Sequence, residues 1–192
     1  MSNTARRAVF LDRDGVLNVY LPGDYAKTPD DLILLPGAAQ AVRRLNDAGL
    51  PVFVLSNQQG VGKGIMSHDD LRVVDTSLRD KLQREAGATV LQSYYCTHLS
   101  ADQCECRKPG PGLFLQAARE HNLDLSASVF VGDTETDAQA ARAANVGTFI
   151  FVLSGKYQNN PAVLQNPDRF PQAPNHTAPD LAQAVEWLLC AE

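Results

Sequence analysis

Two carboxylates stand one residue apart at the end of an apolar run in AVFLDRDGVL (residues 8–17), where Asp12 and Asp14 flank Arg13. Like charges at this spacing repel each other unless a positive charge lies between them. Two carboxylates at a strand end can hold a hard divalent cation, and one can also act as a nucleophile and the other as a general acid and base. The plain alternative is a solvated turn. We expect the Arg13 side chain to leave the strand end on another side, with an incidental charge.

Three further motifs carry residues that suit a phosphorylated ligand. In VLSNQQGVG, the hydroxyl of Ser56 and the backbone N–H groups after it can donate to phosphate oxygens, unless Ser56 only caps a strand. In CRKPGPG, Lys108 precedes a predicted helix start, where an anion site is favourable, although Arg107 and Lys108 could also be a solvated pair. In VGDTETD, Asp133 is a candidate metal ligand supported by Asp137, unless both only cap a helix.

Three of the four cysteines lie within residues 96–106, together with a histidine. The spacing C-x-H-x5-C-x-C offers three thiolates and one imidazole, which fit a closed tetrahedral zinc site. Such a zinc would be structural, and it would stiffen a loop that leads directly into Arg107 and Lys108. A loop of unpaired thiols is one alternative and a catalytic cysteine is another. The predicted zinc ligands are Cys96, His98, Cys104 and Cys106.

Short apolar runs alternate with helical patterns, and we find no internal repeat. The runs are rich in Val, Ile and Phe, as buried parallel strands are, and the segments between them have an apolar face and capping residues. We therefore predict an α/β fold, a Rossmann-like three-layer sandwich with a central parallel sheet and an inserted zinc-bound loop. The predicted strands are residues 8–12, 51–56, 90–96, 128–133 and 147–153, the predicted helices are 36–49, 67–87, 110–122, 134–145 and 178–190, and an irregular loop follows residue 154.

The predicted sheet would bring the polar motifs together. Asp12, Ser56 and Asp133 each end a predicted strand, and ligands of such sheets bind at the carboxyl ends of the strands, near a switch point in strand order. We therefore expect one site at this edge.

Length and charge narrow the functional class. A chain of 192 residues suits a single domain (residues 1–192), and a net charge of −5 argues against a nucleic-acid surface or an anionic-membrane binder. The N-terminal MSNTARR lacks the apolar stretch of a signal peptide, and no run approaches the roughly 20 apolar residues of a membrane span. We predict a cytoplasmic monomer that acts on a small molecule, without nucleic-acid or membrane partners.

The motifs DRDGV, SNQ, RKPGPG and GDTETD, in this order, resemble those of the haloacid dehalogenase superfamily of aspartate-nucleophile phosphatases, from about residue 8 to residue 150. The resemblance implies that Asp12 attacks phosphorus and that Asp14 is the general acid and base, kept protonated by its anionic neighbours. An acid at this second position favours a phosphatase over a dehalogenase. The implied magnesium ligands are Asp12, the Asp14 carbonyl and Asp133, supported by Asp137, and the implied substrate contacts are Ser56, Asn57, Gln58, Tyr25, Arg107 and Lys108.

The loop at residues 96–106 resembles the zinc-containing branch of that superfamily, which holds D-glycero-D-manno-heptose 1,7-bisphosphate phosphatases and histidinol-phosphate phosphatases. Neither has a large cap domain, and the spacing leaves no room for one here, so residues 18–28 and the zinc loop would roof an open site. SNQQGVGKG and DRDGVLN, with Tyr25 downstream, resemble the heptose enzymes, whereas the compact CTHLSADQCECRKP resembles the histidinol-phosphate enzymes more. Thr134 stands where heptose enzymes tend to carry a lysine that reaches the substrate.

The predicted reaction is removal of the 7-phosphate of heptose 1,7-bisphosphate. Histidinol phosphate and another small phosphorylated metabolite are the alternatives. A nucleic-acid 3′-phosphatase would need a basic groove and stacking aromatics, and a non-catalytic zinc-stabilised module would not need both Asp12 and Asp14.

Overall fold

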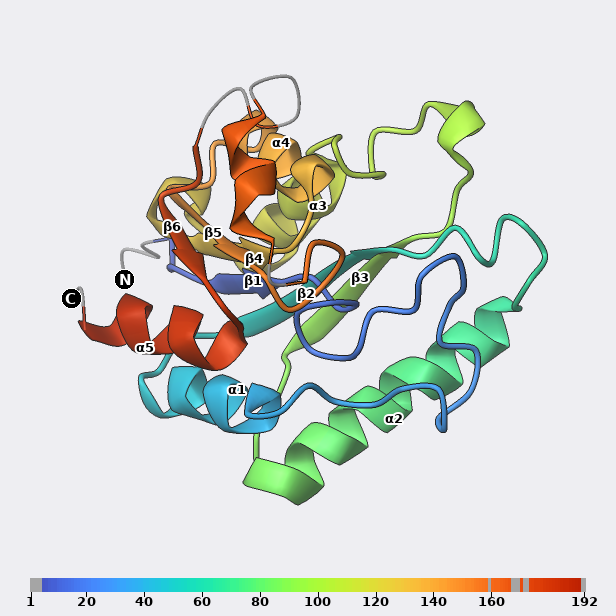
Figure 1. Ribbon diagram of the computed structural model, residues 1–192, viewed down its shortest axis with the longest axis horizontal. Helices are drawn as coiled ribbons and strands as arrows, with labels where there is room; N and C mark the ends of the chain where they lie inside the picture. Colours follow the sequence, from blue (N-terminus) through green and yellow to red (C-terminus); the bar gives the residue numbers. More distant parts are fainter. Residues whose placement is uncertain (1–4, 159, 167–169, 171–172, 191–192) are drawn as a thin grey trace.

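Six parallel strands form the central layer of the computed structural model, which describes residues 5–158, 160–166, 170 and 173–190 (Figure 1). Their order in the sheet is β3-β2-β1-β4-β5-β6, so the connections run outward in opposite directions from β1. The crevice beside β1 is therefore the switch point at which a ligand site is expected. The strands are β1 (Val9–Leu11), β2 (Val52–Asn57), β3 (Gln92–Cys96), β4 (Val129–Gly132), β5 (Thr148–Val152) and β6 (His176–Ala178).

Alternating residue types in the central strands decide which helices cover each face. Valines such as Val9 and Val131 point to one face, and phenylalanines such as Phe10 and Phe130 point to the other, because side chains alternate along a strand. The valine face packs against α1 (Ala38–Asp47), α2 (His68–Ala86) and α5 (Leu181–Cys190), and the phenylalanine face packs against α3 (Gly112–His121) and α4 (Glu135–Ala143). Figure 1 shows these three layers, with α1, α2 and α5 below the sheet.

Helix α2 illustrates how local sequence sets the boundaries. The Ser67 side chain accepts from the N–H of Asp70, and the Asp70 carboxylate accepts from the N–H of Ser67, which completes a capping box. Apolar residues at helical spacing then bury one face of α2, and Gly87 ends the helix in the left-handed conformation at φ 64°.

The predicted α/β fold and each predicted strand and helix are confirmed, with ends that differ by at most a few residues. Strand β6 was missed because it has only three residues and only Ala178 among them is buried. The predicted irregular loop includes a 3₁₀ helix at Pro161–Gln165, and its residues 159, 167–169 and 171–172 lie outside the described part. Residues 15–35 contain no helix, and no helix in the described part is long and apolar enough to cross a membrane.

Candidate active site

A pocket of about 160 Å³ opens at the carboxyl ends of β1, β2 and β4, where the sequence predicted a site. Asp12 follows β1, Ser56 lies near the end of β2, and Asp133 follows β4. Side chains from the predicted roof at residues 18–28 border the same pocket. Its lining residues are Asp12, Asp14, Tyr20, Leu21, Asp24, Tyr25, Ser56, Asn57, Lys108, Asp133, Thr134, Thr136 and Asp137.

Lys108 lies between two carboxylates. Its Nζ is 3.0 Å from Asp12 Oδ1 and 2.6 Å from Asp137 Oδ1, and it donates to the carbonyl of Leu55 at 3.0 Å. The side chain is only 2% exposed, so water screens these charges little. Burial alone would lower the pKa of Lys108, but Asp12 and Asp137 outweigh it and raise the pKa, so the ammonium stays charged.

Asp12, Asp133 and Asp137, called the aspartate cluster below, each place a carboxylate oxygen within 4.8 Å of the others. Burial raises the pKa of Asp12 to about 6; Lys108 opposes this rise, and Asp137 and Asp14 add to it. Burial also raises the pKa of Asp133 well above 3.8, and the charges of Asp137 and Asp12 add to that rise. Asp12 and Asp133 therefore bind protons more readily than exposed carboxyl groups do, and a cation would compete with those protons.

The aspartate cluster suits a hard divalent cation. When ionised, its three negative charges face the one positive charge of Lys108, and a dication would neutralise the remaining two. Asp133 Oδ1 is buried without a hydrogen-bond donor among the described residues, whereas its Oδ2 accepts from the backbone N–H of Lys156 at 2.7 Å. A buried carboxylate oxygen without a partner is unfavourable unless a cation binds it.

Asp137 holds the loop that carries Asp133. Its Oδ2 accepts from the backbone N–H groups of Asp133 at 3.2 Å and Thr134 at 3.0 Å, and from the Thr134 hydroxyl at 2.6 Å. These bonds also cap α4. Asp137 thus shapes the turn at Asp133 and contributes its other oxygen to Lys108.

Arg13 overturns one expectation about the opening motif. Its side chain does not leave the site: it is fully buried, and its Nε and Nη2 bind Asp14 at 3.0–3.3 Å. Burial raises the pKa of Asp14, but Arg13 and hydrogen bonds from Asn18 and Gln58 outweigh it and lower the pKa. Asp14 is therefore a carboxylate at rest, not the protonated acid that we expected from its anionic neighbours, because the nearest charge is the guanidinium of Arg13.

The SNQ motif contributes both to the pocket wall and to the support of Lys108. The Asn57 carboxamide donates to the Lys108 carbonyl and accepts from the Lys108 N–H, both at 3.0 Å, so it fixes the Lys108 backbone, and Asn57 also lines the pocket. Gln58 is fully buried, and its Nε2 donates to Asp14 Oδ2 at 2.7 Å and to Ser56 Oγ at 3.1 Å. Since Ser56 Oγ accepts this bond, its own hydrogen can be donated to a ligand in the pocket.

The segment Ser154–Tyr157 is a part of the site that the sequence interpretation missed. Besides the bond from Lys156 to Asp133, the Ser154 hydroxyl donates to the Gly15 carbonyl at 2.7 Å. A Cβ atom on Gly155 would overlap the Asp133 carboxylate, and one on Gly15 would lie 2.5 Å from Asp133 Oδ2. A serine and a glycine directly after a predicted strand, at the carboxyl edge of the sheet, were the available signal.

Arg107 and Tyr25 border the site from two sides. Arg107 lines a neighbouring cavity of about 350 Å³ together with residues of the loop at 96–106, and its Nη1 is buried without a hydrogen-bond partner among the described residues. Asn57, Lys108 and Thr136 line both cavities, which are therefore adjacent. Tyr25 packs its ring over Gly60, where a Cβ would lie 2.9 Å from the ring, and its hydroxyl is 3.3 Å from Lys63 Nζ.

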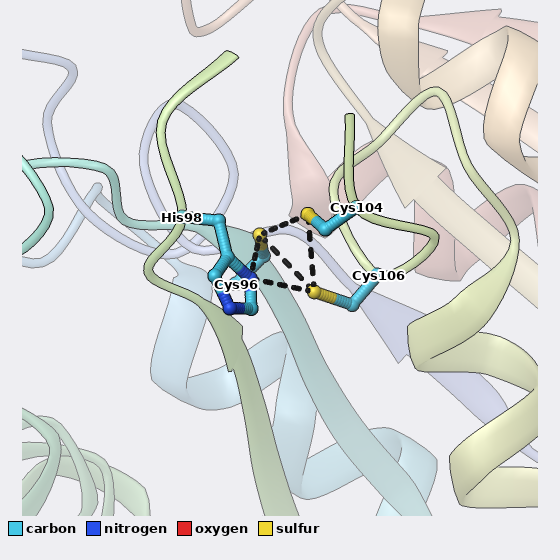
Figure 2. Close-up of side chains that lie close together, drawn as sticks. All are labelled: Cys96, His98, Cys104 and Cys106. Carbon is cyan, nitrogen blue, oxygen red and sulfur yellow. Dashed lines mark hydrogen bonds between the residues drawn. The ribbon is translucent and has the colours of Figure 1, made fainter. Parts of the chain in front are cut away.

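The four predicted zinc ligands converge on one point (Figure 2). The three sulfur–sulfur distances are 3.3–3.6 Å, and His98 Nδ1 is 3.7 Å from Cys96 Sγ and 3.2 Å from Cys106 Sγ. A tetrahedron with metal–sulfur distances of about 2.3 Å has edges of about 3.8 Å, close to this spacing. Burial, with help from the neighbouring thiols, raises the pKa of Cys106 to about 12, so without a metal this thiol resists ionisation. The donor set fits one tetrahedral metal ion.

Comparison with known proteins identifies close relatives. A heptose enzyme of Thermosynechococcus vestitus, D-glycero-D-manno-heptose-1,7-bisphosphate 7-phosphatase, is 40% identical over 95% of each chain. A D-glycero-beta-D-manno-heptose-1,7-bisphosphate 7-phosphatase of Rhodopseudomonas palustris is 40% identical over 76% of this chain and 83% of its own.

Solved structures agree with these sequence matches. The crystal structure of D,D-heptose 1,7-bisphosphate phosphatase from B. bronchiseptica, complexed with magnesium and phosphate, superposes with a TM-score of 0.86 at 32% identity, over 97% of this chain and 99% of that one. The enzyme class predicted from the motifs is confirmed, since these relatives are phosphatases. The model of the haloacid dehalogenase-like hydrolases matches residues 6–145, and this chain belongs to that family.

Proposed function

We propose that this phosphatase removes the 7-phosphate of D-glycero-D-manno-heptose 1,7-bisphosphate through an aspartyl-phosphate intermediate. The observation that carries the chemistry is the convergence of Asp12, Asp14, Ser56 and Lys108 on one pocket beside the aspartate cluster. The names of the relatives described above supply the substrate.

Asp12 is the nucleophile in this proposal. Its Oδ1 lies against Lys108 Nζ, and its side chain borders the pocket, so a phosphoryl group bound by Lys108 and Ser56 would meet the carboxylate directly. Attack forms the phosphorus–Asp12 bond and releases the sugar oxygen, and Lys108 stabilises negative charge on the phosphoryl oxygens.

Asp14 is the proton-transfer group. Its ionised resting state suits the second half-reaction, in which it accepts a proton from the water that attacks the aspartyl phosphate. In the first half-reaction it takes up a proton from the solvent of the open pocket and donates that proton to the leaving oxygen, which leaves Asp14 ionised again.

The aspartate cluster supports Mg²⁺ as the resident metal. Asp12 and Asp133 would hold it with carboxylate oxygens, and Asp137 would keep Asp133 in place. Bound Mg²⁺ supplies the positive charge that lets an anionic carboxylate approach a phosphate dianion. At the second cluster, Cys96, His98, Cys104 and Cys106 would hold a structural Zn²⁺ that orients Arg107.

A bisphosphate substrate needs a second cationic group, which binds the phosphate that is not hydrolysed. The buried and unpartnered Nη1 of Arg107, on the wall of the 350 Å³ cavity next to the pocket, suits the distal phosphate. Thr134 supplies no charge on the other side, so Arg107 carries this contact alone in our proposal. We also propose that residues 1–192 act as one domain, because the strands that lead into Asp12, Ser56 and Asp133 belong to a single sheet.

The test measures phosphate release from both anomers of heptose 1,7-bisphosphate and from histidinol phosphate, with Mg²⁺ present. We expect the highest kcat/KM for a heptose bisphosphate, with the remaining phosphate at C1 by ³¹P NMR. Asp12→Asn, which nearly preserves the shape of the side chain, is the matched inactive control. A higher kcat/KM for histidinol phosphate would replace the proposed substrate, and no release from any of these esters would refute the proposal.

A further inference from the structure

Arg13 forms a buried ion pair that the proposed chemistry has not yet used. Its Nε and Nη2 both reach Asp14 Oδ1, at 3.3 and 3.2 Å, and Nη2 also reaches Oδ2 at 3.0 Å. The Arg13 side chain is fully buried, whereas that of Asp14 is 24% exposed toward the pocket. The guanidinium therefore binds the carboxylate on its buried side and leaves the other side accessible from the pocket.

We propose that Arg13 is a positioning residue, which holds the Asp14 carboxylate in the orientation needed for proton transfer. This inference rests on the proposed function, because it assumes that Asp14 exchanges protons with the leaving oxygen and with water. A carboxylate in that role must present an oxygen within hydrogen-bond reach of the reacting atoms. A misplacement of about 1 Å in an active site can lower the rate about 100-fold.

The other donors around Asp14 contact one oxygen each. Asn18 Nδ2 binds Oδ1, at 2.9 Å, and Gln58 Nε2 binds Oδ2, at 2.7 Å. Both are neutral amides, so neither supplies a charge opposite the carboxylate. The guanidinium contacts both oxygens with one rigid planar group, so it restrains the rotation of the whole carboxylate.

A chain of polar contacts holds Arg13 itself in place. The guanidinium lies over the ring of Tyr95, with Cζ 5.8 Å from the ring centroid, and the Tyr95 hydroxyl donates to Asp75 Oδ1 at 2.6 Å. Asp75 Oδ2 accepts from Arg79 Nε at 2.9 Å, and Arg79 in turn donates to Ser93 Oγ at 2.9 Å. Helix α2 thus holds the Tyr95 ring of strand β3, against which the Arg13 guanidinium packs.

Stability alone does not account for this arrangement. A buried ion pair rarely stabilises a fold more than apolar side chains of similar volume would. Arg13 also has a buried Nη1 without a hydrogen-bond partner among the described residues, which is unfavourable. The guanidinium contacts the proposed proton-transfer group through both oxygens, which indicates a role in the reaction.

The experiment is a double-mutant cycle on the intact chain with Mg²⁺. We expect Arg13→Met to lower kcat about 100-fold and to change KM less than about threefold, because Lys108 and Ser56 still bind the phosphoryl group. Arg13→Lys keeps the charge but not the planar fork, and should recover part of the loss. In an Asp14→Asn background, Arg13→Met should cause no further loss, since it acts only through Asp14.

Tyr95→Phe tests the same inference with a smaller change, should Arg13→Met fail to fold. It removes the bond to Asp75 and should lower kcat about threefold to tenfold. Tyr94→Phe is the matched control with no expected effect on kcat, because the neighbouring Tyr94 hydroxyl binds Glu120, away from the site.

Two results would overturn this inference without affecting the proposed function. One is an Arg13→Met chain whose kcat stays within threefold of that of the unaltered chain. The other is a double variant whose loss in kcat equals the product of the two single losses. An unaltered chain that hydrolyses none of the phosphate esters would refute the proposed function, and this inference with it.

Discussion

Replacing Lys108 with methionine tests the electrostatic core of the site. Methionine has nearly the same length but no charge, so the substitution removes both ion pairs and the bond to Leu55 while filling the same space. Asp12 and Asp137 then remain buried without their cation. Breaking a buried ion pair by removing one partner costs about 3–5 kcal/mol of the free energy of unfolding.

For a chain of this size, that loss corresponds to a decrease in Tm of roughly 6–20 °C. The decrease should be larger at pH 8 than at pH 5, because Asp12 and Asp133 take up protons at low pH and no longer repel each other. With the ammonium gone, a dication no longer neutralises the three carboxylates, and kcat should fall to the background rate.

Thermal unfolding followed by circular dichroism, at both pH values and without metal, measures the stability effect, and phosphate release measures the activity. Lys63→Met is the control: Lys63 is exposed, and among the described residues its ammonium contacts the ring and hydroxyl of Tyr25, so Tm should change little. A Lys108→Met chain that unfolds within 2–3 °C of the unaltered one at pH 8, below the range derived above, would show that Lys108 does not neutralise these carboxylates.

Three further predictions concern the two metal sites. First, the purified chain should contain one zinc ion, and Cys104→Ser should lower its zinc content. Because the zinc-bound loop orients Arg107, this variant should raise the KM for a bisphosphate more than it lowers kcat, and a zinc-free chain with unchanged Tm and KM would contradict the prediction. Second, Gly155→Ala should weaken Mg²⁺ binding about 10–100-fold by calorimetry, since the new methyl displaces Asp133, and unchanged affinity would disprove the close contact. Third, the pKa of Asp12 is raised from 3.8 to about 6, so the contribution of Asp12 to the stability of the metal-free chain falls as the pH rises from about 4 to 6. The increase in Tm on adding Mg²⁺ should therefore grow over that pH range. An increase that does not depend on pH would be evidence against metal binding at Asp12.

The strands and helices could be predicted because their signals are local. Runs such as VFVLS combine β-branched residues with alternating side-chain size, and these properties decide both the strand and its faces. The convergence of Asp12, Ser56 and Asp133 followed from the parallel order of the strands alone, since the carboxyl ends of such strands share one edge.

Side-chain directions beyond the strand ends could not be predicted in the same way. After Leu11 the backbone leaves the extended conformation, and Gly15 has a φ of 87°, so the alternation that places side chains no longer applies. Arg13 therefore turned inward against expectation. The bonds from Asn57 to Lys108 could not be predicted for a related reason: the partners belong to a backbone 51 residues away, and no local pattern encodes that contact.

The contact among Gly15, Asp133 and Gly155 also bears on how the protein is made. The four sequence motifs have all been synthesised once residue 137 has been added, yet the backbone N–H that holds Asp133 belongs to Lys156. A nascent chain that ends between these residues would contain every proposed catalytic group but lack the segment that packs against the metal-binding loop. Because such long-range contacts form late in folding, we expect a ribosome-bound chain to become active only after β5 and Ser154–Tyr157 have left the exit tunnel.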